Sequence, residues 1–105
     1  MIDDLLDRVW RKGYTCNEFA CDAWKVIKGE DLSVKLESHL NGKSKFKLLK
    51  KQKSPCLVFM SNSDTSSSHI GIFYNEKVLH LSTMGVQYIP LETISLYFKK
   101  VRFYQ

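Results

Sequence analysis

The chain has 105 residues, of which 44% are apolar and 12% are aromatic. This length corresponds to one domain over residues 1–105, and the apolar content supplies a hydrophobic core, which excludes a chain that is disordered throughout. The net charge of +5 permits an anionic partner without identifying one. No apolar run approaches the roughly 20 residues of a membrane-spanning helix, so we expect no membrane span.

The first four residues, MIDD, are acidic and show neither the basic nor the apolar region of a signal peptide. We therefore expect synthesis in the cytoplasm without a signal peptide. The three cysteines, Cys16, Cys21 and Cys56, are odd in number and lack the spacing of a disulfide framework. Reduced thiols are the expectation.

The first half of the chain shows patterns that are typical of helices. Apolar side chains at helical spacing over residues 2–10 predict an amphipathic helix closed by Gly13. A second helix is predicted from Cys16 to about Lys28, and a short third one over residues 32–40. The segment 43–53, with six lysines, is predicted to be an exposed loop or a frayed helix.

After Pro55 the composition becomes that of strands. The continuous apolar run over residues 56–60 predicts a central strand, and the Ser-rich stretch 61–68 predicts a loop. The remaining predicted elements are strands over 69–74, 77–81, 85–89 and 100–104, with a short helix from 90 to about 98. Helices followed by an antiparallel sheet predict an α+β fold.

Cys16 lies at the predicted start of a helix. Thr15 and Glu18 have the spacing of a capping box, which makes Thr15 the N-cap. A thiol at the first helical position faces unpaired N–H groups and the positive end of the helix dipole, and both favour thiolate, although Glu18 partly offsets the dipole. We expect Cys16 to be a nucleophile whose backbone N–H donates to the oxyanion, with the Tyr14 hydroxyl as a second donor.

Two histidines are predicted to share one face of a β-hairpin. If Asn75-Glu76 is a two-residue turn, His80 lies opposite Gly71 and His69 is its diagonal neighbour. Gly71 leaves room for both rings. The other face of the hairpin is apolar core, so we expect the histidine face to meet the Cys16 helix. A change of one residue in the turn would separate the histidines.

A thiol, a histidine and a second polar group that orients the histidine are the parts of a Cys/His hydrolase. In this interpretation Cys16 is the nucleophile, His69 is the general base and His80 orients His69. Gln87 and Asn75 are the alternatives for the third position. A zinc site formed by the same cysteine and histidines lacks motif spacing, so neither a metal nor a cofactor is expected.

These features resemble the NlpC family of bacterial cell-wall cysteine peptidases, which belongs to the papain-like superfamily. The matching blocks are Tyr14-Thr15-Cys16, Pro55-Cys56-Leu57-Val58-Phe59, Ser68-His69-Ile70-Gly71-Ile72-Phe73-Tyr74 and Val78-Leu79-His80. The resemblance implies a papain-like α+β domain with N-terminal helices packed on an antiparallel sheet. It also implies a Cys/His/His triad that hydrolyses an amide in peptidoglycan stem peptides. The small size is similar to that of phage tail-associated members, which implies a virion-associated protein that acts at the cell wall.

A second hypothesis follows from departures from the family pattern. The family usually has Asp before the cysteine and Ser-Gly after it, whereas this chain has Thr15 and Asn17-Glu18. The alternative function is a catalytically inactive binding module that contacts phage tail or host proteins. The basic segment 43–53 could attract an anionic polymer, but no nucleic-acid-binding signature accompanies it, so nucleic acid is not the expected partner.

Overall fold

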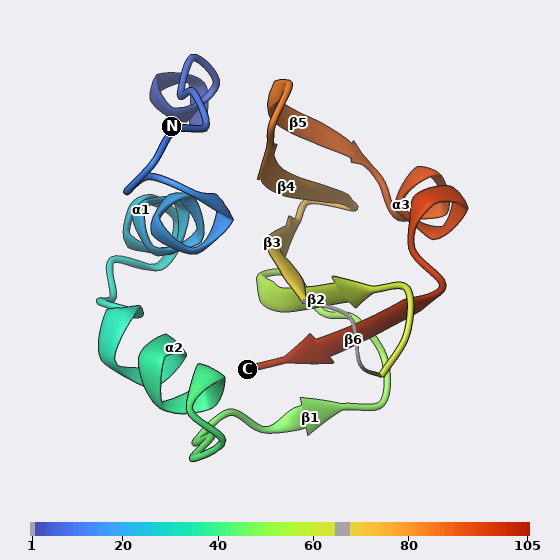
Figure 1. The fold of residues 1–105 in the computed structure, drawn as a ribbon. Helices are drawn as coiled ribbons and strands as arrows, with labels where there is room; N and C mark the ends of the chain where they lie inside the picture. Colours follow the sequence, from blue (N-terminus) through green and yellow to red (C-terminus); the bar gives the residue numbers. More distant parts are fainter. Residues whose placement is uncertain (1, 65–67) are drawn as a thin grey trace.

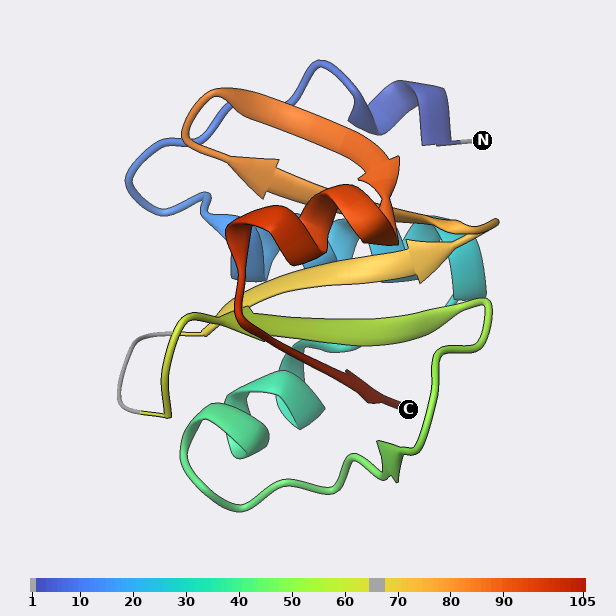
Figure 2. The ribbon, with the colours of Figure 1, turned by 90° about the vertical axis from the view of Figure 1, so that its right-hand side faces the viewer.

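The structure of the protein is a computed structural model that describes residues 2–64 and 68–105. Its elements, in chain order, are the 3-10 helix η1 (Ile2–Leu5), α1 (Cys16–Lys28), α2 (Ser33–Leu40), β1 (Leu48–Leu49), β2 (Cys56–Ser61), β3 (His69–Tyr74), β4 (Lys77–Ser82), β5 (Gly85–Pro90), α3 (Leu91–Tyr97) and β6 (Lys100–Tyr104). Within the described ranges, the strands form one antiparallel sheet in the order β1-β6-β2-β3-β4-β5. Figures 1 and 2 show this sheet as a middle layer, with α1 and α2 on one side and α3 on the other.

Helix α1 begins and ends where the sequence predicts. The Glu18 carboxylate accepts hydrogen bonds from the backbone N–H and the hydroxyl of Thr15, each at 2.7 Å, which is the arrangement of a capping box. Gly29 ends the helix with φ 71°, a left-handed conformation that glycine adopts without steric cost. Cys16 is therefore the first residue of α1, as predicted.

The predicted helix over residues 2–10 is wrong, because only the four-residue η1 forms. Leu5 is its one fully buried side chain among the described residues, whereas Val9 and Trp10 are exposed. A helix of about ten residues is marginal in water without an apolar face packed on the core. A local backbone bridge instead shapes the end of the segment: Arg11 and Tyr14 exchange two backbone hydrogen bonds around Gly13.

Each face of the sheet carries its own hydrophobic core, because side chains alternate along each strand. The strand residues under α1 and α2 are Leu57, Phe59, Ile70, Ile72, Leu79 and Leu81. The second core, which includes Ile94 of α3, contains the strand residues Cys56, Val58, Met60, Phe73 and Val78. Both faces are covered, so β2 is buried along its whole length and the predicted central strand is confirmed.

The prediction of a papain-like fold with N-terminal helices packed on a sheet is wrong. Among the described residues there are three α-helices and a six-stranded antiparallel sheet, and the first expected N-terminal helix is absent. In addition, α3 follows β5 and packs Ile94 against the face opposite α1. The helices therefore cover both sides of the sheet, with α1 and α2 on one face and α3 on the other (Figure 1).

The hairpin of β3 and β4 has the predicted two-residue turn. Asn75 and Glu76 adopt φ values of 50° and 71°, as a type I′ turn requires. Ladder pairing runs from this turn to Ile72 and Leu79 and stops there. The expected pair of Gly71 and His80 is therefore not a ladder pair, since the two strands separate at this point.

The basic segment 43–53 is an extended connection that includes the short strand β1, paired with β6. It is neither a frayed helix nor a purely irregular loop. The predicted loop 61–68 lies partly outside the described residues, and its first residue belongs to β2. Within the described part of the chain, no helix is long and apolar enough to cross a membrane.

Candidate functional site

One cavity of ≈ 490 Å³ brings together Cys16, His69 and His80. The three side chains come from the start of α1, the start of β3 and the middle of β4. Gln87 of β5, directly opposite His80, lines the same cavity. The structure thus gathers in one place the three residues predicted to act in catalysis.

The Cys16 thiol lies where β3 and β4 separate. Ladder pairing ends at Ile72, and the backbone N–H of Ile70 hydrogen-bonds the Cys16 sulfur. The Cys16 Sγ also lies 3.8 Å from Asn17 Oδ1. Because the two strands separate here, the first residue of α1 reaches a cavity that the two histidines also line.

Burial raises the pKa of the Cys16 thiol above its ordinary value, and the nearby Glu18 carboxylate raises it further. Hydrogen bonds from the backbone N–H groups of Ile70, Cys16 and Asn17 act in the opposite direction. The helix start therefore stabilises thiolate as the sequence predicts, but desolvation outweighs it. The net direction is opposite to the predicted lowering.

His69 and His80 form a hydrogen-bonded pair. His69 Nε2 lies 2.8 Å from His80 Nδ1, and the two rings are nearly perpendicular. The His69 ring also stacks on Phe98, with an interplanar angle of 6°. The prediction that both histidines share one face is confirmed.

The prediction that the histidine face of the hairpin contacts α1 is only partly right. Helix α1 packs over the opposite face, against Ile70 and Leu81, and Cys16 belongs to that core. The histidines share the α3 side of the sheet with Met60, the ladder partner of His69. Cys16 reaches the histidine cavity because it is the first residue of α1.

Burial lowers the pKa of His69 to about 4, and the neighbouring His80 adds to this lowering. Burial also lowers the pKa of His80, whereas the Gln87 side chain, acting as an acceptor beside the ring, raises it. Both rings are therefore neutral at pH 7. Since two neutral rings share one proton between Nε2 of His69 and Nδ1 of His80, one of them must donate.

The tautomer that suits a general base has His69 donating from Nε2. Nδ1 of His69 is then unprotonated and can accept a proton, and His80 carries its proton on Nε2. That Nε2 is buried and, among the described residues, has no hydrogen-bond partner. Gln87, opposite His80, is the polar side chain placed to act on this ring.

Tyr14 lies in a different environment from the one predicted. Its hydroxyl donates to Asp22 at 2.7 Å and accepts from Arg8 at 2.7 Å. Burial, followed by the bond to Asp22, raises its pKa to about 12. Tyr14 does not line the cavity of Cys16. The network instead fixes the segment before α1.

Of the two alternatives for the third position, the structure brings only Gln87 to the site. Asn75 is exposed in the hairpin turn, where its backbone N–H donates to Ser54 Oγ at 3.0 Å. Three aromatic residues that were not predicted as site residues, Trp10, Tyr97 and Phe98, also line the cavity. Their only signal in the sequence is that they are aromatic residues outside the strands.

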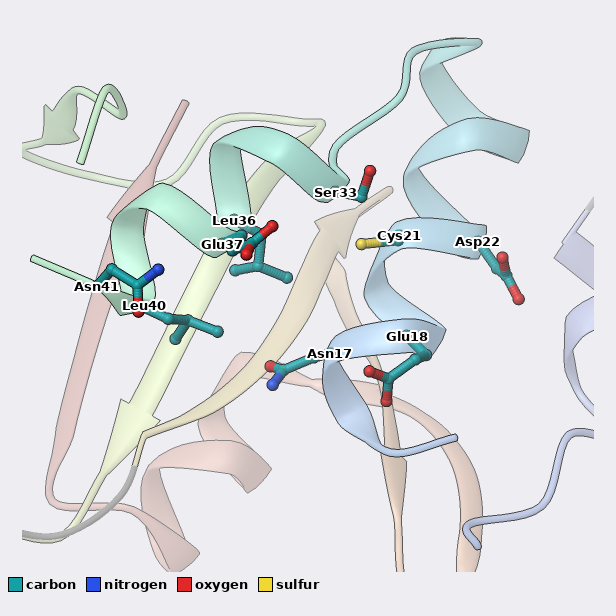
Figure 3. Close-up of a pocket in the computed structure, with 9 residues that line it drawn as sticks. All are labelled: Asn17, Glu18, Cys21, Asp22, Ser33, Leu36, Glu37, Leu40 and Asn41. Carbon is teal, nitrogen blue, oxygen red and sulfur yellow. The ribbon is translucent and has the colours of Figure 1, made fainter. Parts of the chain in front are cut away.

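Cys21 lies in a separate cavity of ≈ 480 Å³ between α1 and α2, shown in Figure 3. Burial and the neighbouring carboxylates, Asp22 first among them, raise its pKa to about 11. Within residues 2–64 and 68–105, no group of three His, Cys, Asp or Glu side chains is placed to hold a metal ion. Cys16 and Cys21 thus lie in distinct surroundings on one helix.

No family model, curated protein or solved structure matches this chain.

Proposed function

We propose that the protein is a cysteine hydrolase that cleaves an amide bond, with Cys16 as nucleophile and His69 as general base. One observation carries this proposal: Cys16, His69 and His80 line one cavity, and the two histidines are bonded through Nε2 of His69. The bond leaves Nδ1 of His69 as the nitrogen that can exchange a proton with the thiol. A nucleophile, a base and a group that orients the base are the parts that covalent acyl transfer needs.

The proposed reaction has two steps. The Cys16 sulfur attacks the carbonyl carbon while its proton passes to Nδ1 of His69, and that proton then leaves with the departing amine as the C–N bond breaks. Water, deprotonated by His69, next attacks the thioester carbon, the C–S bond breaks to release the acid, and the proton on His69 returns to the Cys16 sulfur. Throughout both steps His80 holds the His69 ring. The backbone N–H of Cys16, at the start of α1, is the proposed donor to the oxyanion.

The proposed substrate is the stem peptide of peptidoglycan. This part of the proposal is supported by the resemblance of the sequence blocks around Cys16, His69 and His80 to the NlpC family. A small, phage tail-associated protein acting at the cell wall is the proposed setting, on the same support.

A second candidate is a catalytically inactive binding module for phage tail or host proteins. A specific observation favours it: the pKa of the thiol is raised and that of His69 is lowered. Both groups are therefore neutral at rest, whereas a thiolate–imidazolium pair would have the opposite charges. In addition, the Cys16 sulfur hydrogen-bonds Ile70 and Asn17.

Incubation with purified stem peptides, followed by mass spectrometry, tests the two candidates. We expect wild type and Cys21→Ala to cleave an amide, and Cys16→Ala and His69→Ala to lose at least about a thousandfold in rate. Undiminished cleavage by Cys16→Ala would exclude the proposed nucleophile. Absence of cleavage by wild type, together with a Cys16 alkylation rate that His69→Ala leaves unchanged from pH 6 to 10, would favour the binding module.

A further inference from the structure

The cavity around Cys16 differs in charge from the rest of the protein. About a quarter of the chain is charged, yet none of the described residues that line this cavity is Asp, Glu, Lys or Arg. By contrast, Glu18, Asp22 and Glu37 line the cavity beside Cys21 (Figure 3). A charged substrate group that entered the Cys16 cavity would lose hydration without gaining a counter-ion, which is unfavourable.

The two histidines add no positive charge to this cavity at neutral pH. Burial keeps the pKa of His69 near 4 and lowers that of His80. Neither ring therefore offers a positive charge to a carboxylate. The polar groups on the lining are neutral ones, including the Gln87 amide, which suit the N–H and C=O groups of a peptide.

The rim of the cavity is apolar and exposed. Trp10 is 43% exposed, Tyr97 66% and Met84 90%, and all three line the cavity. They come from the segment before α1, from α3 and from the turn between β4 and β5. Apolar side chains that gather at the mouth of a cavity mark a binding surface, and Trp and Tyr contribute most where a partner covers them.

One part of this rim is anchored by hydrogen bonds within the protein. Arg8 anchors the segment that carries Trp10, through bonds to Tyr14 and Asp22. Phe98 stacks on His69, so the aromatic surface continues to the proposed base. A side chain held against the rim would therefore place its neighbouring carbonyl group near Cys16 with little reorganisation.

We propose that this cavity takes an uncharged amide substrate with an apolar group beside the scissile bond, seated against Trp10, Tyr97 and Met84. The inference rests on the proposed function and specifies its substrate class. Among stem peptides, it favours those in which the carboxylates near the bond are amidated. Peptides with a free carboxylate at this position are poor substrates.

Alkylation of Cys16 by three matched reagents tests the inference without requiring turnover. The reagents are iodoacetamide, N-benzyliodoacetamide and N-(4-carboxybenzyl)iodoacetamide, with each rate divided by the rate for N-acetylcysteine. The same Cys16 thiolate attacks all three reagents and displaces iodide, so the raised pKa of Cys16 cancels from the ratios of their rates. Peptide mass spectrometry of the full chain separates Cys16 from Cys21 and Cys56.

We expect the benzyl reagent to gain about fivefold or more over iodoacetamide at Cys16, and the carboxybenzyl reagent to lose most of that gain. Trp10→Ala and Tyr97→Ala should each reduce the gain to about twofold or less, whereas Trp10→Phe should keep most of it. Leu96→Ala is the matched control, because Leu96 is 81% exposed and does not line the cavity. Thermal unfolding of each variant verifies that it is folded.

Equal ratios for the benzyl and carboxybenzyl reagents would overturn the inference, as would a gain that both Trp10→Ala and Tyr97→Ala leave unchanged. Failure of the proposed hydrolase is a separate result. If no stem peptide is cleaved but the benzyl gain depends on Trp10 and Tyr97, the cavity is a binding site for neutral apolar groups. If a stem peptide is cleaved but the benzyl gain does not depend on Trp10 and Tyr97, the protein is the proposed hydrolase and its substrate belongs to a different class.

Discussion

Gly71 shows how closely the site is packed at the scale of single residues. It lies on β3 between the two histidines, where the strands begin to separate. A Cβ at this position would lie 3.0 Å from Leu79 O, 3.0 Å from Val78 Cγ1 and 3.1 Å from His80 Cβ. The room that glycine leaves is thus already filled by backbone and by His80.

Gly71→Ala should therefore destabilise the protein by about 1–3 kcal/mol, because an added methyl group must displace backbone in a packed core. Urea unfolding followed by circular dichroism measures the change. Met84→Ala, at a 90% exposed position, is the control and should stay within about 0.5 kcal/mol of wild type. A Gly71→Ala variant as stable as wild type would show that the strands can separate further at no cost.

Gln87 is the second residue whose role the structure makes testable. Its side chain raises the pKa of His80 against the effect of burial. Gln87→Leu should therefore lower the pKa of His80 further, and NMR titration of the imidazole carbons measures it. Gln52→Leu, in the exposed basic segment, should leave the titration unchanged. If the pKa of His80 is unchanged in Gln87→Leu, Gln87 does not act on the His80 ring and has no role in positioning the histidines.

At the scale of elements, local signals predicted the parts whose causes are local. The capping box at Thr15 and Glu18 predicted the start of α1, and the turn Asn75-Glu76 predicted which face the histidines share. The prediction of a helix over residues 2–10 was wrong because the core contacts stop early: Leu5 is buried and Ile2 packs against the core, but Val9 and Trp10 are exposed. The shift in the pKa of Cys16 was predicted in the wrong direction. Burial raises this pKa, and burial depends on contacts with residues far away in the sequence.

The turn of the β3–β4 hairpin offers a stabilising substitution. Glu76 has a φ of 71°, a conformation that costs an L-residue about 1 kcal/mol and that glycine adopts freely. Glu76→Gly should therefore raise the free energy of unfolding by about 0.5–1 kcal/mol, as the Asn-Gly preference of type I′ turns indicates. Glu76→Ala, which keeps the strain and removes the charge, is the control. A loss of stability in Glu76→Gly would contradict the assigned turn.

At the scale of the whole molecule, the histidines couple stability to pH. Burial lowers the pKa of His39, His69 and His80. A residue with a lowered pKa binds its proton in the unfolded state first, so acid favours unfolding. His39 belongs to this group because its ring packs among Phe46, Phe59 and Tyr104.

We therefore expect the free energy of unfolding to be highest at neutral pH. It should fall as the pH drops from about 6.5, the ordinary histidine pKa, towards the pKa of His69 at about 4. Urea unfolding at pH 7.5, 6 and 5 measures the loss, in a range above the titration of most carboxylates. His69→Gln should flatten the slope. Stability that stays constant from pH 7.5 to 5 would contradict the buried, neutral histidines.

The order of the strands could not be predicted, because it depends on pairings between distant parts of the chain. The sequence indicated the strands, but nothing local placed β6 between β1 and β2 or α3 on the face opposite α1. Those two contacts decide the layers, and their absence from the prediction is why the expected papain-like arrangement was wrong.

The place of β6 also bears on how the protein is made. β6 is the last strand in chain order, yet it pairs along β2, from Leu57 to Ser61. On a translating ribosome, β2 and β3 leave the exit tunnel well before β6 does. One edge of the apolar strand β2 therefore stays open during synthesis, and open strand edges recruit other chains. Completion of the sheet, and protection from aggregation, must wait until residues 100–104 have emerged.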